Sequence, residues 1–163
     1  MKKTIKLVVI LILLNSIIGC GSAKSGEEYN ATFSIDCKTI LDNMDILNNN
    51  KVQAIPADGI IMARTEVVFY EGESVFDVLK RETVANKIHL EFSLTPIHNA
   101  AYIEGIGNIY EFDCGNLSGW SYLVNGDSLG YSSSEYKLKD GDVVEWRYSC
   151  DLGIDTSEQS DIK

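Results

Sequence analysis

The sequence predicts an α+β domain with a mixed sheet. Strand and helix patterns alternate in the first half of the chain, and short strands separated by Gly, Asn and Asp fill the second half. Alternating or β-branched runs predict strands over residues 29–36, 60–70 and 88–94. Helical spacing predicts two helices, one between the first two of these strands and one over about 75–86. The later strands are expected at 110–113, 120–124, 131–138 and 143–150.

Capping boxes mark the start of both predicted helices. Thr39-x-x-Asp42 precedes the first helix, in which Ile40, Met44 and Leu47 recur at helical spacing. Ser74-x-x-Asp77 precedes the second helix. The residues expected to face the core from the second helix are Val75, Val78 and Leu79.

Turn dipeptides fix the expected pairing of the later strands. Asn125-Gly126 and Asp140-Gly141 favour two-residue hairpin turns, because both central positions of such a turn need positive φ. If Asp140-Gly141 is such a turn, Leu138 faces Val143 and Tyr131 faces Cys150 across the hairpin.

The N-terminus has the pattern of a lipoprotein signal peptide. Three lysines precede an apolar run that is short for a membrane span, and the run ends at Gly19-Cys20. We therefore expect cleavage after residue 19 and acylation of Cys20, which anchors the protein to the extracytoplasmic face of the cell membrane. An ordinary signal peptide with an incidental cysteine is the alternative. Residues 20–28 then form a lipidated tether, 29–153 the folded domain and 154–163 a polar tail.

The charge of the chain argues against nucleic acid as a partner. The formal net charge is −10, and removal of residues 1–19 takes away three lysines and makes it −13. Such a protein repels phosphate backbones and anionic membrane surfaces. Acidity that only keeps an extracytoplasmic protein soluble explains the charge better than a specific cationic partner does.

Catalytic motifs are absent from the sequence. It has no Gly-x-Ser-x-Gly, phosphate-binding glycine loop or His-Glu-x-x-His, and its two histidines, His89 and His98, are expected to be structural or exposed. The sequence thus favours a non-enzymatic protein that uses no cofactor.

The acidic stretches at 140–142 and 151–155 could offer oxygens to calcium, but their spacing differs from an EF-hand and solvated turns explain them. A metal-binding surface domain stays open as an alternative.

Three stretches of the chain resemble a known family. They are EGESVFDVLKRE (71–82), AYIEGIGNIYEFDCGNLSGWSYLVNG (101–126) and YKLKDGDVVEWRYSCD (136–151). Together they are similar to the transcobalamin-like C-terminal domain, the domain-of-unknown-function family numbered 4430. The resemblance covers nearly all of residues 29–153 and implies a β-grasp-like mixed sheet with one or two helices packed on it. In vitamin carriers this domain closes over cobalamin bound against a separate helical domain, and we expect residues 20–163 to be too few to include such a domain.

The same resemblance bears on the cysteines. With Cys20 lipidated, three cysteines remain and allow at most one intramolecular disulfide. Many relatives carry a cysteine where Tyr131 stands, which implies that Cys150 is a free thiol here and that Cys37 pairs with Cys114. Three reduced, buried cysteines are the alternative.

Aromatic side chains suggest where a ligand would bind. Trp120 and Tyr122 share one face of their strand, and Val144, Trp146 and Tyr148 share one face of the last strand. These residues could form core or the wall of a site. We predict a ligand site lined by Trp120, Tyr122, Asn125, Gly105, Gly107 and Asn108, with Tyr131 at its rim.

Two functions are consistent with these observations. The first is an anchored lipoprotein that binds a small molecule, such as cobalamin or another corrinoid, for an uptake transporter. The second is a cell-surface module that binds protein or glycan. A deep pocket beside the aromatic residues favours the first function, and a flat convex face favours the second.

Overall fold

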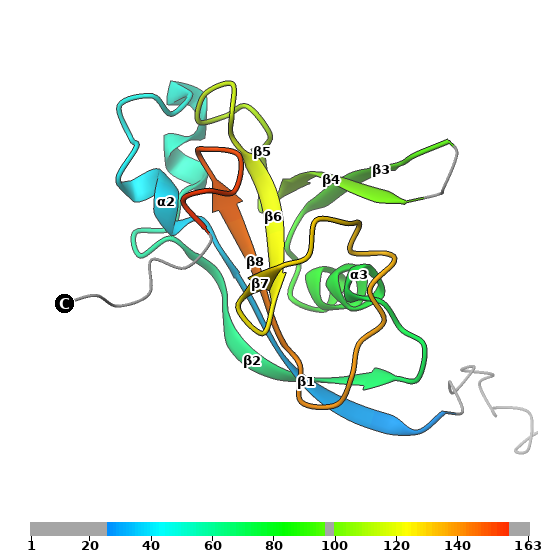
Figure 1. Cartoon of the computed structure of the whole chain (residues 1–163). Helices are drawn as coiled ribbons and strands as arrows, with labels where there is room; N and C mark the ends of the chain where they lie inside the picture. Colours follow the sequence, from blue (N-terminus) through cyan, green and yellow to red (C-terminus); the bar gives the residue numbers. More distant parts are fainter. Residues whose placement is uncertain (1–25, 97–99, 157–163) are drawn as a thin grey trace, which may run out of the picture.

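The computed structural model describes residues 26–96 and 100–156, which form two sheets and a few helices (Figure 1). The predicted signal peptide, Cys20, His98 and most of the tether and tail lie outside these ranges. The elements, in chain order, are β1 (Glu28–Asp36), α2 (Lys38–Leu41), the 3-10 helix η1 (Asn49–Ala54), β2 (Ile60–Tyr70), α3 (Val75–Ala85), β3 (Leu90–Leu94), β4 (Ala101–Ile106), β5 (Ile109–Tyr110), β6 (Gly119–Val124), β7 (Asp127–Ser128) and β8 (Val143–Ser149).

The larger sheet is mixed, as predicted. Its strands run in the order β2-β1-β8-β6-β7, and the smaller sheet has the order β3-β4-β5. Strand β1 is parallel to β8, whereas the other pairs are antiparallel. Figure 1 shows α3 beside the sheet and the β3–β4 hairpin projecting away from it. This arrangement confirms the predicted α+β, β-grasp-like fold class.

The core lies between one face of the larger sheet and α3. Alternation along β1 buries Ala31, Phe33 and Ile35, as the sequence predicts, and these residues pack with Val78 and Leu79 of α3. We call this cluster the main core. A second core surrounds Tyr148 at the end of β8 and consists of Cys37, Ile40, Leu47, Ile109, Cys114 and Tyr148.

Helix α3 begins at the predicted capping box. The Ser74 hydroxyl accepts a hydrogen bond from the backbone N–H of Asp77, and the Asp77 carboxylate accepts one from the backbone N–H of Ser74. Burial by itself would raise the pKa of Asp77. The hydrogen bonds from Ser74 and the contact with Lys80 outweigh burial and lower this pKa to about 2. The box therefore holds a carboxylate that stays ionised at the helix N-terminus, where its charge is favourable.

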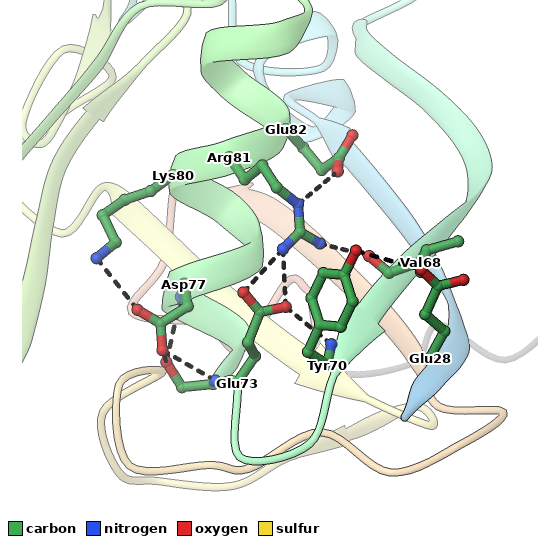
Figure 2. Close-up of polar contacts among 9 residues, drawn as sticks. Glu28, Val68, Tyr70, Glu73, Asp77, Lys80, Arg81 and Glu82 are labelled. Atoms are coloured by element: carbon green, nitrogen blue, oxygen red, sulfur yellow. Dashed lines mark hydrogen bonds and ion pairs between the residues drawn. The ribbon is translucent and has the colours of Figure 1, made fainter. Parts of the chain in front are cut away.

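Arg81 of α3 forms an ion pair with the β2–α3 turn and a hydrogen bond with the edge strand β2 (Figure 2). Arg81 donates two hydrogen bonds to the Glu73 carboxylate, at 2.8 and 2.7 Å, and one to the Val68 carbonyl. Glu73 also accepts a hydrogen bond from the backbone N–H of Tyr70. Because Glu73 is buried, this two-pronged contact satisfies a carboxylate that would otherwise be costly to remove from water.

The first predicted helix is much shorter in the structure. Helix α2 ends at Leu41, and its N-cap residue, Cys37, makes no side-chain cap. The predicted capping box at Thr39 is wrong, because the Thr39 hydroxyl donates to the carbonyl of Tyr148 at 2.5 Å instead. Leu47 is buried as expected, whereas Met44 is exposed. A tertiary hydrogen bond to β8 thus replaces the local cap that the sequence suggested.

The predicted hairpin at Asn125-Gly126 is confirmed. Both residues have positive φ, 55° and 87°, and Val124 pairs with Asp127 across the turn. Asn125 is joined to Asp142 and Val143 by its side-chain amide. The turn that ends β6 is therefore tied to the start of β8.

The second predicted hairpin is wrong. Gly141 has a φ of 84°, but Asp140 does not share its positive φ, and residues 131–138 form turns instead of a strand. The N–H of Asn30 donates to the Asp140 carboxylate, so this turn packs against β1. Because β8 pairs with β1 and β6, Tyr131 does not face Cys150.

A buried carboxylate explains the path of this loop. Asp142 accepts hydrogen bonds from the amide of Asn125, the hydroxyl of Tyr136 and the N–H of Lys139. These hydrogen bonds fix the path of the loop across the end of the sheet before β8 begins. A two-residue turn would leave the carboxylate without these partners, and burial of such a group is costly.

The cysteines also differ from expectation. No disulfide forms among the cysteines at 37, 114 and 150, which are the ones that the structure describes. The predicted Cys37–Cys114 bridge is absent; the Cys114 thiol donates a hydrogen bond to the Asn43 carbonyl, and its pKa is influenced by the nearby Cys150 thiol. The prediction rested on sequence resemblance, and the tertiary fold brings a different pair together.

Candidate functional site

Two adjoining pockets form one groove beside β6, which we call the aromatic groove. One has a volume of about 420 Å³ and the other about 270 Å³. They share Tyr102 of β4, Trp120 and Ser121 of β6, and Ser128 of β7. The remaining lining residues discussed below are Phe112, Leu117, Leu152, Tyr122 and Tyr131.

The groove follows a half-open edge of the larger sheet. Strand β6 pairs with β8 along its whole length, but β7 covers its other edge only at Leu123 and Val124. Among the described strands, residues 119–122 therefore pair on one side only. Strand β4 approaches β6 across the gap. Alternation in β4 buries Ala101 and Ile103 and turns Tyr102 outward, where it is 50% exposed.

Trp120 forms the floor of the groove and is anchored in the protein. It is half-buried and packs against both the main core and the second core. Its ring meets Tyr148 edge to face, with 5.3 Å between the ring centroids. Its indole N–H donates to the carbonyl of Ile109 at 2.8 Å. The ring is thus held in one orientation while part of it stays open to the groove.

Tyr122 and Tyr131 form one end of the groove. Tyr122 is 8% exposed, and its hydroxyl donates to the backbone carbonyl of Tyr131 at 2.9 Å. Burial, followed by nearby tyrosine and glutamate charges, raises the pKa of Tyr122. The side chain of Tyr131 is 48% exposed. A buried tyrosine therefore holds the loop that carries an accessible one.

Tyr102 forms the opposite wall. Its hydroxyl donates to the Glu111 carboxylate, and this hydrogen bond, together with burial, raises the pKa of Tyr102 to about 12. The hydroxyl is therefore neutral at physiological pH. The wall of the groove presents a ring and a protonated phenol, which suit a ligand with both apolar and polar parts.

Large apolar side chains border the other end of the groove. Phe112, Leu117 and Leu152 are all exposed. Phe112 and Leu152 also have positive φ, 66° and 49°, which bulky residues rarely adopt. Backbone hydrogen bonds hold both residues, from Phe112 N–H to Ser118 and from Leu152 N–H to Leu117. Strained backbone of this kind is common at ligand clamps.

The structure brings together only part of the predicted ligand site. Trp120, Tyr122 and Tyr131 all line the aromatic groove. Asn125 does not line it, because its amide joins Asp142 and Val143 in the β6–β7 turn. Binding of a ligand by these residues stays a prediction.

The glycine segment lies outside the groove lining as well. Gly105 belongs to strand β4, where an added Cβ would lie 2.8 Å from the Tyr110 ring. Gly107 and Asn108 form the β4–β5 turn, with φ of 63° and 65°. The Asn108 carbonyl accepts a hydrogen bond from Lys51. Ring packing and turn geometry account for these residues without a ligand.

Four large side chains of the groove were not predicted from the sequence: Tyr102, Phe112, Leu117 and Leu152. The alternation of Ala101, Tyr102 and Ile103 is a signal that could have identified an outward tyrosine on a strand. Phe112, Leu117 and Leu152 lie in turns, where no period marks the direction of a side chain.

The described part of the chain shows no metal centre. Within residues 26–96 and 100–156, no group of three or more His, Cys, Asp and Glu side chains is arranged to hold a metal ion. The Asp155 carboxylate, in one of the acidic stretches considered for calcium, accepts hydrogen bonds from the Ser149 hydroxyl and the N–H of Cys150.

Within residues 26–96 and 100–156, no helix has the length and apolar content needed to cross a membrane.

Comparison with known families identifies the domain. The family model described as domain of unknown function DUF4430 matches residues 72–150. Residues 72–150 form a DUF4430 domain. The match confirms the family resemblance predicted from the sequence, and the match includes β6, β8 and most of the lining of the aromatic groove. None of the curated proteins matches this chain.

Two solved structures are similar to this chain over a longer stretch than residues 72–150. Haptocorrin in complex with Cbi, a corrinoid, superposes with a TM-score of 0.55 and 15% identity, covering 83% of this chain and 28% of the haptocorrin chain. A protein from Ruminococcus gnavus ATCC 29149 for which metal binding has been suggested gives a TM-score of 0.46 and 12% identity, covering 74% of this chain and 96% of that one. At these identities the first similarity shows a shared fold alone, and this chain spans little more than a quarter of haptocorrin.

Proposed function

We propose that this protein is a non-enzymatic, lipid-anchored binding protein that holds a small, flat, partly polar molecule in the aromatic groove, with a corrinoid as the leading ligand class. The observation that carries the proposal is the groove itself. It combines the anchored ring of Trp120, the phenols of Tyr102 and Tyr131, and a half-open strand edge.

The size and chemistry of the groove support small-molecule binding. Ligand pockets usually measure about 300–1,000 Å³ and have apolar walls with a few placed polar groups. The larger pocket, at about 420 Å³, falls within this range. The fold shared with haptocorrin, which was crystallised with Cbi, adds support for a corrinoid. Because the groove is open, a second surface or partner would be needed to enclose a large ligand fully.

The N-terminal sequence supports the proposed anchor, and the proposed uptake role depends on that anchor. Acylated Cys20 would hold the domain near the extracytoplasmic membrane face, where it could pass a captured ligand to a transporter. The Cys20→Ala variant should lose its detergent-phase partitioning and remain unprocessed or be released. Unchanged partitioning of this variant would contradict the anchor.

An extended peptide is the second candidate ligand. The edge of β6 at residues 119–122 pairs on one side only among the described strands, and such edges can accept another strand. This alternative corresponds to a cell-surface protein-interaction module.

Equilibrium dialysis of the purified full chain against cyanocobalamin and against Cbi tests the proposal. We expect saturable binding, and we expect Tyr102→Ala and Tyr131→Ala each to weaken it about tenfold or more, since loss of one aromatic contact costs about 1.5 kcal/mol. Val84→Ala is the matched control, because Val84 is an apolar side chain on α3 that is 78% exposed and does not line the groove.

Two outcomes would contradict the proposal in different ways. Absence of saturable binding of either corrinoid removes the leading ligand class. Binding that Val84→Ala weakens as much as the groove variants do places the ligand elsewhere. Saturable binding of an extended peptide that Tyr102→Ala abolishes would favour the second candidate.

A further inference from the structure

Two cysteines from distant parts of the chain meet beside the second core. The Cys114 and Cys150 thiols lie close enough for each to influence the pKa of the other. The Cys150 sulfur also lies 3.8 Å from the Thr39 hydroxyl, and the Cys114 sulfur lies 3.5 Å from the Asn43 carbonyl oxygen. The amide of Asn43 donates to the Thr39 carbonyl at 2.8 Å, so both sulfurs rest against the same short turn.

The backbone around each cysteine fixes this proximity. Gly119 pairs with Ser149 where β6 meets β8, and beyond that pair the N–H of Leu152 donates to the Leu117 carbonyl at 2.9 Å. The two chain segments therefore run side by side past the end of the ladder. The backbone N–H of Cys114 donates to the Ser118 hydroxyl, which closes the turn that carries its thiol. Strand pairing thus holds the two thiols near each other.

We propose that Cys114 and Cys150 form an intramolecular disulfide when the protein folds after export. The bond would join the loop that carries Phe112 and Leu117 to the loop that carries Leu152, and these loops border one end of the aromatic groove. The inference rests on the proposed extracytoplasmic location, because disulfides persist in oxidising compartments.

The oxidant is the disulfide of a thiol–disulfide oxidoreductase or of a small oxidised thiol. One cysteine thiolate attacks that disulfide, forms a mixed disulfide and releases one sulfur of the oxidant as a thiolate. The second cysteine thiolate then attacks the mixed disulfide, forms the Cys114–Cys150 bond and releases the other oxidant sulfur. The two protons lost by the cysteines end on the two oxidant sulfurs. The cysteine pair is oxidised by two electrons and the oxidant is reduced by two.

Burial determines when this reaction can occur. Burial, followed by the neighbouring Cys114 thiol, raises the pKa of Cys150 to about 12. A buried thiol of this kind holds little thiolate and reacts slowly in the folded protein. The bond therefore forms while the chain folds, when both thiols still ionise at ordinary pH.

Cys37 is the cysteine left unpaired. It is fully buried in the second core at the start of α2. Burial, followed by the charge of Asp36, raises its pKa to about 12. Cys37 is therefore expected to stay a free thiol that reacts only after unfolding.

Peptide mapping of the full chain tests the proposal. The protein is purified from membranes after export, unfolded in denaturant with N-ethylmaleimide, and digested without reduction. We expect a peptide that links Cys114 to Cys150 and alkylation of Cys37. A Cys37–Cys114 or Cys37–Cys150 peptide, or alkylation of all three cysteines, would overturn the proposal.

A second preparation separates this inference from the proposed location. The full chain is reduced, unfolded and refolded in detergent with a glutathione redox buffer, so that oxidation does not depend on export. The Cys114–Cys150 peptide should form here as well. If it forms after refolding and not in cells, the bond is possible but the proposed location is wrong. If it forms in neither preparation, the pairing itself is wrong.

Thermal unfolding gives an independent readout. Because a disulfide constrains the unfolded chain, reduction should lower the thermal midpoint by roughly 5–15 °C. Cys114→Ser and Cys150→Ser should each remove the sensitivity of the thermal midpoint to reductant. Because either single variant already lacks the disulfide, the double variant should lower the midpoint further only through lost packing. Cys37→Ser is the matched control and should retain the full shift on reduction. Loss of the shift in Cys37→Ser alone would contradict the assignment.

Discussion

Two aromatic pairs bridge the same two strands and differ in what surrounds them. Trp120 of β6 faces Tyr148 of β8, and two residues further along β6, Tyr122 faces Trp146. Their ring centroids lie at similar distances, 5.3 and 5.5 Å, although the first pair is edge to face at 78° and the second is tilted at 33°. Trp146 is 2% exposed and its indole N–H has no hydrogen-bond partner among the described residues, whereas Trp120 has a partner and opens onto the groove.

The difference shows that strand register does not by itself separate core from site. Alternation places all four rings on one face, and that face is covered by the core at Trp146 and left partly open at Trp120. What opens it is the short strand β7, which leaves residues 119–122 of β6 without a second partner among the described strands. The two tryptophans therefore have different roles, and mutation should separate them.

The largest expected effect is on Trp146. Trp146→Ala removes the largest fully buried side chain of the main core and should lower the free energy of unfolding by about 3–5 kcal/mol, measured by denaturant titration. Trp146→Phe keeps an aromatic ring and removes an unpaired buried donor, so it should cost less than about 2 kcal/mol. Equal losses in the two variants would contradict a packing role for this ring.

Trp120 should be intermediate. Trp120→Ala loses contacts with both cores and leaves the Ile109 carbonyl without its donor, so we expect a loss of about 2–4 kcal/mol in the free energy of unfolding. Trp120→Phe should recover more than half of this stability. It should still weaken ligand binding, because the phenyl ring of the variant offers a smaller face than the indole. Full stability in Trp120→Ala would mean that its ring serves the groove alone.

Tyr122 connects the two roles. Its ring packs on Trp146, and its hydroxyl holds the backbone of Tyr131 at the groove. Tyr122→Phe keeps the ring and should cost only about 1 kcal/mol in the free energy of unfolding, because one hydrogen bond is lost. Hydrogen exchange in the loop 129–133 should accelerate in this variant. Unchanged exchange there would show that the hydroxyl does not order the loop.

Tyr131 should have the smallest effect on stability. Its side chain is half exposed, and its role in the Tyr122 hydrogen bond uses only the backbone, so Tyr131→Ala should change the free energy of unfolding by less than about 0.5 kcal/mol. The same variant should weaken corrinoid binding in equilibrium dialysis. A stability loss near that of Trp120→Ala would place Tyr131 in the core.

The elements that the sequence predicted best are those with a local signal. Strand β2, helix α3 with its Ser74 cap, and the Asn125-Gly126 turn match their predicted bounds closely, because alternation, a capping box and a turn dipeptide each act over a few residues. The first helix and the Asp140-Gly141 hairpin failed where tertiary partners compete. Thr39 bonds to β8 instead of capping, and Asp142 accepts hydrogen bonds from Tyr136 and Lys139 in the loop before it and from Asn125 in the β6–β7 turn.

The candidate site was predictable only in part for a related reason. Trp120 and Tyr122 lie on a strand whose alternation the sequence shows, and both reach the groove. Tyr102 comes from a different sheet, and Leu152 reaches the groove only because its backbone is hydrogen-bonded to Leu117. No local sequence pattern indicates which strands and turns become neighbours. The wall formed by Tyr102 and the end bordered by Leu152 could therefore not be predicted from the sequence.

The two tryptophans allow a direct test of the central claim, because the chain contains only these two. The full chain labelled with ¹⁵N gives one indole N–H signal from Trp120 and one from Trp146, assigned with Trp120→Phe. On titration with Cbi in detergent solution, the Trp120 signal should shift progressively and saturate, while the Trp146 signal stays in place. A shift confined to Trp146, equal shifts of both signals, or no shift of either would contradict a ligand site in the aromatic groove.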